Sequence, residues 1–391
     1  MFQTRPCTFK MFGTRPDTGI KKETNMKPTK IGVIGCGTIC GIYFTSLRKF
    51  PTVEVAACAD IDIKKAKAKA AEFSVPRACT VDELLADKDI SLVVNLTIPV
   101  VHAEVSIRAL NAGKHVYSEK PLATTRKDAA RVIEVAKRKK LRIGCAPDTV
   151  LGGGIQTCKK IIDDGWIGKP VAATAFMMGH GPEAWHPNPF FFYEPGAGPL
   201  FDVGPYYVAA LITLLGPVKT VASMARMSFK QRLATSKEHF GKTIEVKTPT
   251  HVAGTLEFAN GAIGTLITSF DVWGTKTPRI EIYGSEATLA VPDPNTFGGP
   301  IQIRRMGIAE FVDIPVMFPY AENFRGLGAA DIVHAVMNKR DHRANGEIAY
   351  HSVDVMESLL EASKAQKHLK IKSSCKRPAL MPLGRAMGML D

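Results

Sequence analysis

The chain has 391 residues, 45% of them apolar, which is enough for two or three domains with separate hydrophobic cores. Nowhere do about 18 apolar residues follow one another, so the sequence predicts no membrane-spanning helix. The formal net charge is +14, but residues 1–30 hold +5 of it and residues 364–391 hold +6. Because the body is close to neutral and has no basic stripe interleaved with aromatic residues, we expect no nucleic-acid partner.

The first 28 residues have the composition of an extension that does not belong to the fold. They contain a tandem duplication, MFQTRPCT and MFGTRPDT, in which Pro6 and Pro16 interrupt any continuous helix. A secretory signal needs an uninterrupted apolar segment, which is absent here, and a transit peptide is the remaining targeting alternative. We expect a disordered extension over residues 1–28, with Met26 as a natural start of the folded chain.

The eight cysteines are scattered along the chain, without a CxxC pair and without the His/Cys spacing of a zinc site. This pattern is typical of reduced, mostly buried thiols in a cytoplasmic protein, and it predicts no metal site. A redox role for Cys36 with Cys40 is the alternative, because a helix N-terminus lowers the pKa of a thiol.

The stretch from Lys30 to Gly41, KIGVIGCGTICG, joins a short apolar run to a glycine-rich turn and then to a helical pattern. The apolar run predicts a buried parallel strand, and the helix is expected from about Thr38 to Phe50. Gly35 and Gly37 permit a tight turn and a close approach of the backbone to a pyrophosphate, whose charge would lie at the helix N-terminus. The third glycine position of such a motif is taken by Cys40, with Gly41 one residue late.

An acidic residue follows the second expected strand, Val53 to Ala59. Asp60 lies 20 residues beyond Cys40, where a carboxylate accepts hydrogen bonds from an adenosine ribose. Its charge favours NAD over NADP, because it would repel a 2′-phosphate. Lys64 and Lys65 just beyond it offset part of that repulsion, so NADP is also possible.

Strands and helices continue to alternate up to about residue 146, which predicts a doubly wound parallel sheet. The expected helices are amphipathic, and Gly113 is a C-cap signal. The further expected elements are helices at 64–73, 81–86, 101–112 and 125–140 and strands near Ala78 and at 91–97, 115–118 and 141–146.

Two polar motifs lie at the carboxyl ends of these strands, where ligands bind in such sheets. The first is NLTIP, residues 95–99, followed by His102, for which a capping or packing role is an alternative to function. The second is Glu119-Lys120-Pro121. A lysine at this place can reach both a nicotinamide ribose and a substrate hydroxyl.

The second half of the chain begins with a glycine-rich helix start near residue 151 and then becomes rich in strands. Asn260-Gly261 is a hairpin signal. An open, mostly antiparallel sheet in an α+β domain is therefore expected, followed by helices. The expected strands are 171–177, 218–225, 251–257, 262–269, 280–283, 288–291 and 301–303, and the expected helices are 322–338 and 350–368.

Two segments of this second half carry candidate substrate contacts. Trp185 and His186 lie in a proline-rich loop of the kind that binds sugars by stacking and hydrogen bonding; loop packing is the alternative. Asp202 and Tyr206 stand four residues apart, and they share a face if residues 202–215 form one helix. Capping for Asp202 and core packing for Tyr206 are the structural alternatives.

Taken in order, GCG, NLTIP with His102, EKP, the segment LGGGIQTCKKIIDDGWIGKP and the segment GAGPLFDVGPYY resemble the glucose-fructose oxidoreductase / inositol dehydrogenase (Gfo/Idh/MocA) family. The likeness runs from Lys30 to Pro382. The family's substrate-side signature has an aspartate, matched by Asp202, and four residues later a histidine, whose position is occupied by Tyr206. Ala197 and Pro199 also replace two of its glycines.

The resemblance implies a Rossmann domain at 29–149, a substrate-binding and oligomerisation domain at 150–375 and a tail at 376–391. It implies a homodimer or homotetramer formed through the second sheet. It also implies this set of NAD-contacting residues: Gly35, Gly37, Thr38, Ile39, Asp60, Asn95, Thr97, Pro99, His102, Glu119 and Lys120.

These patterns together predict an NAD(P)-dependent oxidoreductase that moves a hydride between a secondary alcohol of a sugar, polyol or sugar derivative and nicotinamide. Lys120 and Tyr206 are the candidates for proton transfer, because a lysine cation stabilises a neighbouring phenolate and lowers its pKa from about 10. Asp202 would orient a substrate hydroxyl. An NAD-dependent glycosidase with transient redox chemistry, or a non-catalytic sugar or nucleotide sensor, are the alternatives.

Overall fold

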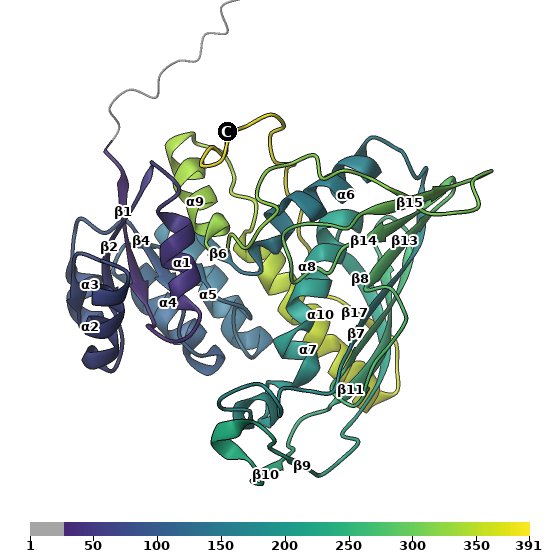
Figure 1. Cartoon of the computed structure of the whole chain (residues 1–391), viewed down its shortest axis with the longest axis horizontal. Helices are drawn as coiled ribbons and strands as arrows, with labels where there is room; N and C mark the ends of the chain where they lie inside the picture. The colour runs from purple at the N-terminus through teal and green to yellow at the C-terminus, as the bar shows by residue number, and fades with distance from the viewer. Residues whose placement is uncertain (1–26) are drawn as a thin grey trace, which may run out of the picture.

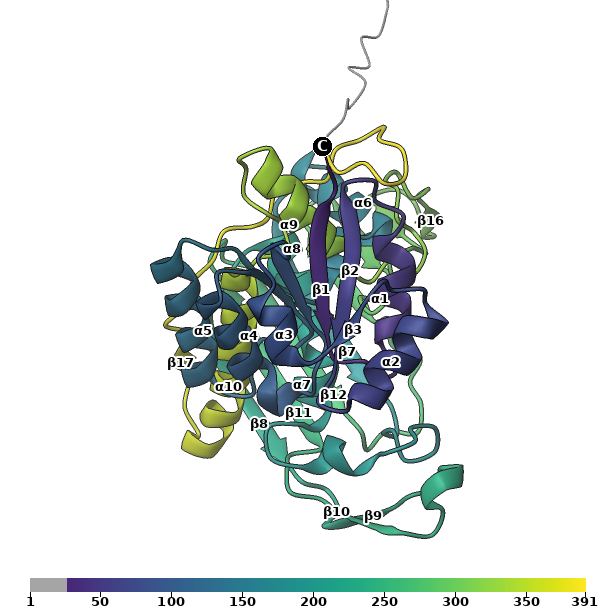
Figure 2. The same ribbon diagram turned by 90° about the vertical axis from the view of Figure 1, so that its left-hand side faces the viewer.

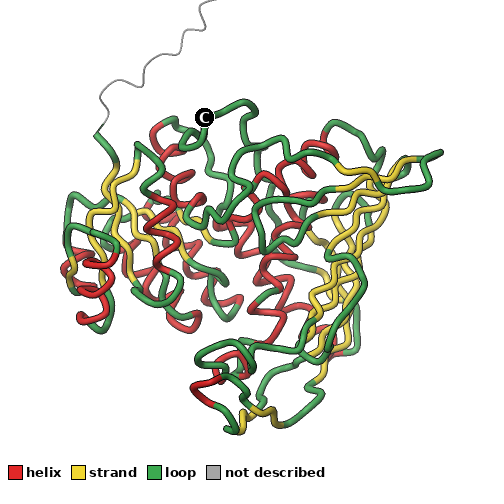
Figure 3. The backbone as a smooth tube through the Cα atoms, viewed as in Figure 1, coloured by secondary structure: helices red, strands yellow, loops and turns green. Residues whose placement is uncertain are grey.

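The computed structural model describes residues 27–391, so the expected extension lies outside the described residues except for Lys27 and Pro28. Two β-sheets stand apart with helices packed between them, as Figure 1 shows with the first sheet on the left and the second on the right. The tube drawing in Figure 3 shows the same layers by type of secondary structure.

The first sheet has six strands, and all of its strand pairs are parallel. Its order is β3-β2-β1-β4-β5-β6. This is the doubly wound order, because successive strands are added on one side of β1 up to β3 and on its other side from β4 onward. The core strands are almost fully buried, in keeping with their apolar sequences. The strands are β1 (Thr29–Ile34), β2 (Val53–Ala59), β3 (Ala78–Cys79), β4 (Leu92–Asn95), β5 (His115–Ser118) and β6 (Ile143–Cys145).

Helices cover both faces of this sheet. Figure 2 shows α1 and α2 on one side and α4 and α5 on the other. Local signals set their starts, since Thr80 forms a capping box with Glu83 and Thr125 caps the helix after it. The helices are α1 (Cys40–Leu47), α2 (Ile63–Glu72), α3 (Val81–Ala86), α4 (His102–Asn111) and α5 (Arg126–Lys139).

The second sheet has nine strands in the order β16-β15-β14-β13-β7-β12-β11-β8-β17. Only the central pair β7 and β12 is parallel, which confirms the expected mostly antiparallel sheet. The strands are β7 (Pro170–Met178), β8 (Val218–Arg226), β11 (His251–Phe258), β12 (Ile263–Ser269), β13 (Ile280–Gly284), β14 (Ala287–Val291), β15 (Gln302–Arg305), β16 (Val312–Asp313) and β17 (Leu369–Lys370), and a separate hairpin is formed by β9 (Gln231–Leu233) and β10 (Thr243–Glu245).

Three helices fill the space between the sheets: α6 (Gly153–Asp163), α8 (Gly204–Leu215) and α10 (Gly346–Ala365). Every residue of α8 is buried, as expected for a helix that is apolar on all sides. A further helix, α9 (Leu327–Met337), packs against α1, β5 and β6 of the first domain. The chain therefore returns to the first domain after the second sheet.

Residues 202–215 do not form one helix, so the condition under which Asp202 and Tyr206 would share a helix face is not met. The structure has a short helix α7 (Gly198–Asp202), a break at Val203 and then α8. Pro205 explains the break, because proline lacks an N–H and its ring clashes with the carbonyl four residues earlier, so α7 cannot continue through it. Asp202 thus ends one helix and Tyr206 lies in the first turn of the next.

Polar contacts join the two domains away from the strand ends. The Arg126 guanidinium, at the start of α5, contacts the carboxylates of Asp354 and Glu361 on α10. The C-terminal tail packs on the body, with Leu390 buried and the Asp391 carboxylate paired with Arg340. Within residues 27–391, no helix is long and apolar enough to cross a membrane.

Candidate functional site

The turn after β1 has the backbone that its glycines predict. Gly35 has φ of +104°, and a Cβ placed there would lie 2.5 Å from the Leu96 carbonyl oxygen, so only glycine fits. A Cβ at Gly37 would meet no protein atom within 4 Å. The main chain at Gly37 therefore faces open space beside the N-terminus of α1, next to the exposed Thr38 and Ile39. This cradle fits the pyrophosphate of a dinucleotide.

Gly41, the glycine that comes one residue later than in the usual motif, permits close packing of α1. A Cβ on Gly41 would lie 2.7 Å from the Phe73 ring, so its absence lets α1 approach the end of α2. Cys40 is buried, and its thiol donates to the Gly37 carbonyl oxygen at 3.0 Å. Burial raises the pKa of the Cys40 thiol to about 11, which is opposite to the activation that a redox role would require.

Asp60 directly follows β2 and holds the glycine turn in place. Its Oδ2 accepts a hydrogen bond from the Cys36 N–H at 2.7 Å, and its Oδ1 accepts one from the Asp62 N–H at 3.0 Å. A carboxylate oxygen can accept more than one hydrogen bond, so both oxygens retain the capacity to accept from a ribose. Ribose binding by Asp60 stays a prediction, whereas its role in the turn was missed from the sequence.

The loop after β4 is organised by side chains that point inward. The Asn95 amide is fully buried; its nitrogen donates to the His102 carbonyl and the Ser106 hydroxyl, and its oxygen accepts from Thr97. The His102 ring is buried between the carbonyl oxygens of Thr97 and Pro121, at 2.8 and 2.7 Å. Burial lowers the pKa of His102.

The Asn95 and His102 side chains thus have a structural task, and contact of these two residues with the cofactor stays a prediction. Both side chains are used to shape the loop, because a buried amide or imidazole must satisfy its hydrogen bonds within the protein. The same loop leaves Thr97 and Pro99 partly exposed. Cofactor contact by these two residues stays a prediction.

Glu119 and Lys120 follow β5 and have different partners. The Glu119 carboxylate accepts from the Tyr43 hydroxyl of α1 at 2.7 Å and from the Lys120 N–H at 2.9 Å, so it fixes the strand end to the nucleotide-binding helix. The Lys120 ammonium crosses to the second domain, where it contacts the Asp202 Oδ1 at 2.9 Å and the Asp202 carbonyl oxygen at 2.5 Å. The side chains of Lys120 and Asp202 are 17% and 24% exposed.

Tyr206 lies against the same lysine, although the helix break separates it from Asp202. The Lys120 Nζ is 5.4 Å from the centre of the Tyr206 ring, which is a cation–π contact. Tyr206 is only 7% exposed. The structure thus brings Lys120, Asp202 and Tyr206 together, as the sequence predicted, with the lysine between the other two.

The protonation of this group differs from the expectation. Burial of Lys120 disfavours its charged form, but Asp202, Tyr206 and Glu119 outweigh it and raise the pKa of the ammonium. Burial likewise raises the pKa of the Tyr206 hydroxyl, and Lys120 and Arg325 only partly offset this. The expected net lowering of the Tyr206 pKa is therefore wrong for the free protein, and both groups are protonated at neutral pH.

A cavity of about 260 Å³ opens beside Lys120 and Asp202, between the loop after β4 and the loop that precedes α7. Its walls are mostly apolar and aromatic, and this composition suits flat rings. Asn188, Glu194 and Thr124 add polar groups at its edges. The residues that form its apolar walls are Ile98, Pro99, Val100, Pro121, Phe191, Phe192, Pro195, Ala197 and Phe201.

Trp185 and His186 do not line this cavity. Trp185 is 69% exposed. The His186 ring packs edge-on against Phe191 and Phe192, with ring centres 5.4 and 4.8 Å apart, and its Nδ1 accepts from the Asn188 N–H. Contact of Trp185 and His186 with a substrate therefore stays a prediction.

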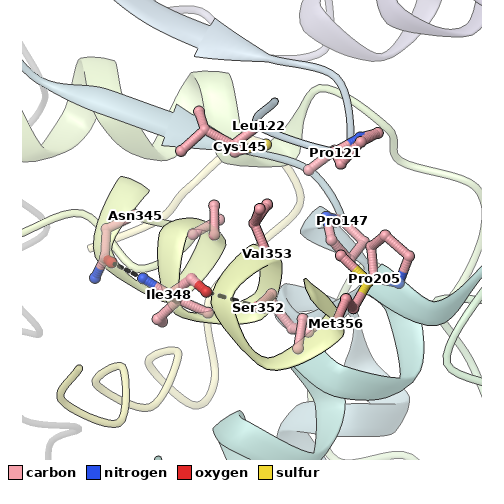
Figure 4. A pocket seen from close by; sticks show the side chains of 15 residues that line it. Pro121, Leu122, Cys145, Pro147, Pro205, Asn345, Ile348, Ser352, Val353 and Met356 are labelled. Carbon is pink, nitrogen blue, oxygen red and sulfur yellow. Dashed lines mark hydrogen bonds between the residues drawn. The ribbon is translucent and has the colours of Figure 1, made fainter. Parts of the chain in front are cut away.

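A second, small cavity lies beside Pro121, and Figure 4 shows it between the ends of β5 and β6 and the helices α8 and α10. Pro121 and Pro147, both after cis peptide bonds, face Pro205, Val353 and Met356 across it. Its volume of about 20 Å³ is too small for a sugar. This space belongs to the packing that supports Lys120.

Sequence reasoning missed several residues of the site. The aromatic run of the 3₁₀ helix η3 (Phe190–Tyr193) supplies two cavity walls and is visible as FFFY. Arg325, whose positive charge acts to lower the pKa of Tyr206, lies in a loop that has no motif. Its place depends on how the chain returns to the first domain, which no local pattern reveals.

Known protein families account for both halves of the chain. Residues 29–146 match the model described as "Oxidoreductase family, NAD-binding Rossmann fold", and residues 155–290 match the "GFO/IDH/MocA C-terminal domain". The first domain is thus an NAD-binding domain, in agreement with the open cradle at Gly37.

Individual relatives are more distant. An uncharacterized oxidoreductase of Schizosaccharomyces pombe is 32% identical over 206 residues, which is 51% of this chain and only 55% of that protein. A dTDP-3,4-didehydro-2,6-dideoxy-alpha-D-glucose 3-reductase of Saccharopolyspora spinosa is 29% identical, over 74% of this chain and 83% of that protein. The structure of levoglucosan dehydrogenase in complex with NADH covers 89% of this chain and 100% of its own, with a TM-score of 0.76 at 19% identity, which shows a shared fold.

The turn glycines give a direct test of the cofactor cradle. We expect Gly37→Ala to keep the melting temperature but to weaken NADH binding about tenfold or more, because its methyl group would occupy the space that a pyrophosphate needs. Gly35→Ala should lower the melting temperature, since the added methyl group meets the Leu96 carbonyl. Fluorescence titration with NADH and thermal unfolding measure the two effects.

Gly274→Ala is the matched control, because a Cβ at Gly274 also meets no atom within 4 Å but lies in the second domain. It should change neither quantity. Unchanged NADH affinity in Gly37→Ala would show that the cofactor does not approach this turn.

Cofactor choice is expected to depend on the Asp60 charge. Asp60→Asn keeps an oxygen that can accept from the Cys36 N–H but removes the repulsion of a 2′-phosphate, so the preference for NAD over NADP should fall about tenfold. Dissociation constants for NADH and NADPH measure this. Asp89→Asn removes the same charge at an exposed position paired with Lys30 and should leave the preference unchanged. If Asp60→Asn also leaves the preference unchanged, the only role of Asp60 is to stabilise the glycine turn.

Proposed function

Because the chain belongs to the GFO/IDH/MocA family of oxidoreductases, we propose that it transfers a hydride between a secondary alcohol of a sugar, polyol or sugar derivative and a nicotinamide cofactor. The bound cofactor would supply or accept the hydride. NAD is the expected cofactor, with NADP as the alternative. The relatives named as a nucleotide-sugar reductase and a levoglucosan dehydrogenase support a sugar-like substrate.

The observation that carries the proposal is the position of the Lys120 ammonium. It lines the cavity at the carboxyl end of β5, in the same domain as the glycine turn, and it is held by Asp202 from the other domain. A carbinol oxygen bound in the cavity would accept hydrogen bonds from the Lys120 ammonium. The Asp202 carboxylate, which holds Lys120, would orient a neighbouring hydroxyl of the same substrate. This arrangement polarises a C–O bond and can pass a proton to or from it.

Tyr206 is the proposed proton reservoir behind Lys120. Its buried ring contacts the lysine, so the charge of one group responds to the protonation of the other. When the alcohol is oxidised, the carbinol proton passes to the pair formed by Lys120 and Tyr206. At the same time the hydride, with its electron pair, leaves the carbon. In the reducing direction, the same pair returns a proton to the carbonyl oxygen.

Apolar walls suit the cavity to both the nicotinamide ring and the carbon face of a sugar. The few polar groups at its edges, Asn188, Glu194 and Thr124, are the candidates for recognising hydroxyls. Association of two copies through the outer face of the nine-stranded sheet stays a prediction. On that face Met224 is 81% exposed and Ile263 60% exposed, on strands separated only by β11.

A screen in both directions tests this function. Free sugars, inositols, sugar lactones and nucleotide sugars are offered with NAD and NADP, and the corresponding ketones with the reduced cofactors. Because Lys120 and Tyr206 both have raised pKa values, the resting site holds a proton to donate. We expect reduction to be fastest near neutral pH and to decline as pH rises through the Tyr206 pKa, whereas oxidation should increase with pH over the same range.

Net formation of the reduced cofactor, in amounts equal to the oxidised product, is the result expected of a dehydrogenase. Cleavage of a glycoside without net cofactor reduction would instead indicate the glycosidase alternative. Ligand binding without turnover in either direction would indicate a sensor.

The proposed pair predicts a non-additive pattern of mutants. Lys120→Met and Tyr206→Phe should each lower turnover at saturating cofactor by roughly 10²- to 10⁴-fold, the range typical of acid–base assistance. The double mutant should be little worse than either single one, because groups that act as a unit are not additive. Steady-state kinetics and NADH dissociation constants separate lost proton transfer from lost cofactor binding.

Tyr207→Phe is the matched control, because Tyr207 is the next residue of α8 and does not line the cavity. It should keep near-normal turnover. Losses that multiply in the double mutant would contradict the shared pair, and turnover restored by saturating cofactor in Lys120→Met would reduce Lys120 to a cofactor anchor.

A further inference from the structure

The loop between β7 and α7, residues 179–197, borders two hollows of the surface. Its second half supplies Asn188, Phe191 and Glu194 to the cavity of about 260 Å³. Its first half, between His180 and Ala184, lines a further hollow of about 480 Å³, which we call the outer hollow. The β9–β10 hairpin and the segment after β12 form its other sides, and Figures 1 and 2 both show this hairpin at the end of the molecule where α7 lies. One loop therefore connects the two hollows.

A buried arginine holds the sides of the outer hollow together. The Arg232 guanidinium, on β9, pairs with the Glu183 carboxylate and donates to the Asp271 Oδ1 at 2.7 Å. It also donates to the carbonyl oxygens of His180 and Phe270, at 2.8 and 2.9 Å. Because Arg232 is buried, these contacts are shielded from water and fix three separate segments to one another. The outer hollow is therefore preformed, as ligand sites usually are.

A tryptophan on this rigid base presents a flat apolar face to the solvent. The Trp273 ring lies on the His180 ring, with ring centres 3.5 Å apart and planes 12° from parallel. Trp273 is nevertheless 86% exposed, so its other face is open. Phe229, which lines the same hollow, is also exposed. Exposed apolar groups that gather beside polar ones are typical of interaction sites and ligand-binding grooves.

Trp185 lies between the two hollows. Its ring packs edge-on against Phe192, a wall of the cavity, with ring centres 6.5 Å apart. The preceding residue, Ala184, lines the outer hollow. Most of the Trp185 ring is exposed, and so is part of Phe191 in the cavity wall. Phe191, Trp185 and Trp273 thus form a series of exposed rings, the aromatic track, that leads from the cavity to the outer hollow.

The chemistry of the aromatic track suits a chain of sugar units. Aromatic rings can cover the C–H faces of pyranose rings, while polar side chains at their edges bind hydroxyls. Gln231 and Thr235 supply exposed polar groups at the outer hollow. A single sugar unit in the cavity would leave Trp185 and Trp273 uncovered, because neither residue lines the cavity. Further units of the same ligand would cover both rings.

We propose that the substrate is an oligosaccharide, whose reacting unit enters the cavity while the following units lie on Trp185 and in the outer hollow. This inference rests on the proposed function, because it narrows the substrate class of the same site. Lys120 and Asp202 would act on the first unit. Trp185 and Trp273 would take no part in the chemistry and would set the preference for longer chains.

A length series tests the proposal. Glucose with cellobiose and cellotriose, glucose with maltose and maltotriose, xylose with xylobiose and xylotriose, and mannose with mannobiose and mannotriose are offered with NAD and NADP. Each sugar is also titrated calorimetrically into the protein saturated with NADH. In at least one series we expect affinity and kcat/KM to rise about tenfold or more from one to three units, as a stacked unit with one or two hydrogen bonds would supply.

Substitutions of the exposed rings show whether the aromatic track causes this rise. Trp185→Ala and Trp273→Ala should reduce it to about twofold or less, whereas Trp185→Tyr, which keeps a ring, should retain most of it. Trp166→Ala is the matched control, because the Trp166 ring contacts Arg305 and lines neither hollow. It should keep the whole rise. Melting temperatures should be unchanged for Trp185→Ala and Trp273→Ala, since both rings are mostly exposed.

The outcomes separate this inference from the proposed function. Turnover of sugars with no rise along any series, or a rise that persists in both alanine variants, would overturn the inference and leave the dehydrogenase in place. A dimer that Trp273→Ala dissociates, measured by light scattering, would also overturn it, since a second copy would then cover the ring. Length-dependent binding that both alanine variants lose, without oxidation or reduction of any sugar, would support the aromatic track and contradict the proposed hydride transfer.

Discussion

The ion pair between Lys120 and Asp202 is the interaction on which the site depends, because it joins the end of β5 to the end of α7 across the boundary between the domains. Both side chains are mostly withdrawn from water, so each would be costly to bury without the other. The pair fixes the lysine at the cavity, and it also fixes the end of α7, which directly precedes the helix that contains Tyr206. A change in either partner alters both domains.

Other polar contacts support this pair from behind. Glu119 anchors the strand end to Tyr43 of the nucleotide-binding helix, so the position of Lys120 is tied to the cradle at Gly37. Asp148 fixes the start of α9 in the same way. These contacts are made by buried carboxylates with specific N–H and O–H donors, and such groups tolerate little displacement because an unpaired buried carboxylate is destabilising. These contacts thus hold the end of β5 against α1 and the end of β6 against α9.

The sequence was sufficient for features that depend on local spacing. Few folds require the spacing along the sequence that separates Gly35, the strand after it and Asp60. The first domain and its cradle were therefore predictable. It was insufficient where tertiary context decides the outcome. Pro205 divides residues 202–215 between two helices, Asn95 and His102 turn inward because their loop needs buried hydrogen bonds, and Trp185 does not line the cavity.

The separation of roles between the domains explains how such a site can change its substrate without losing its chemistry. Lys120 belongs to the nucleotide-binding domain, where its position is set by the sheet, and Asp202 and Tyr206 lie at the end of α7 and the start of α8. The walls that a substrate would touch, in contrast, come mainly from the loop before α7, between Asn188 and Ala197. Loops tolerate substitution more readily than strand ends and helix starts. Recognition can therefore vary through Asn188, Phe191 and Glu194 while the charges around the phenol stay fixed.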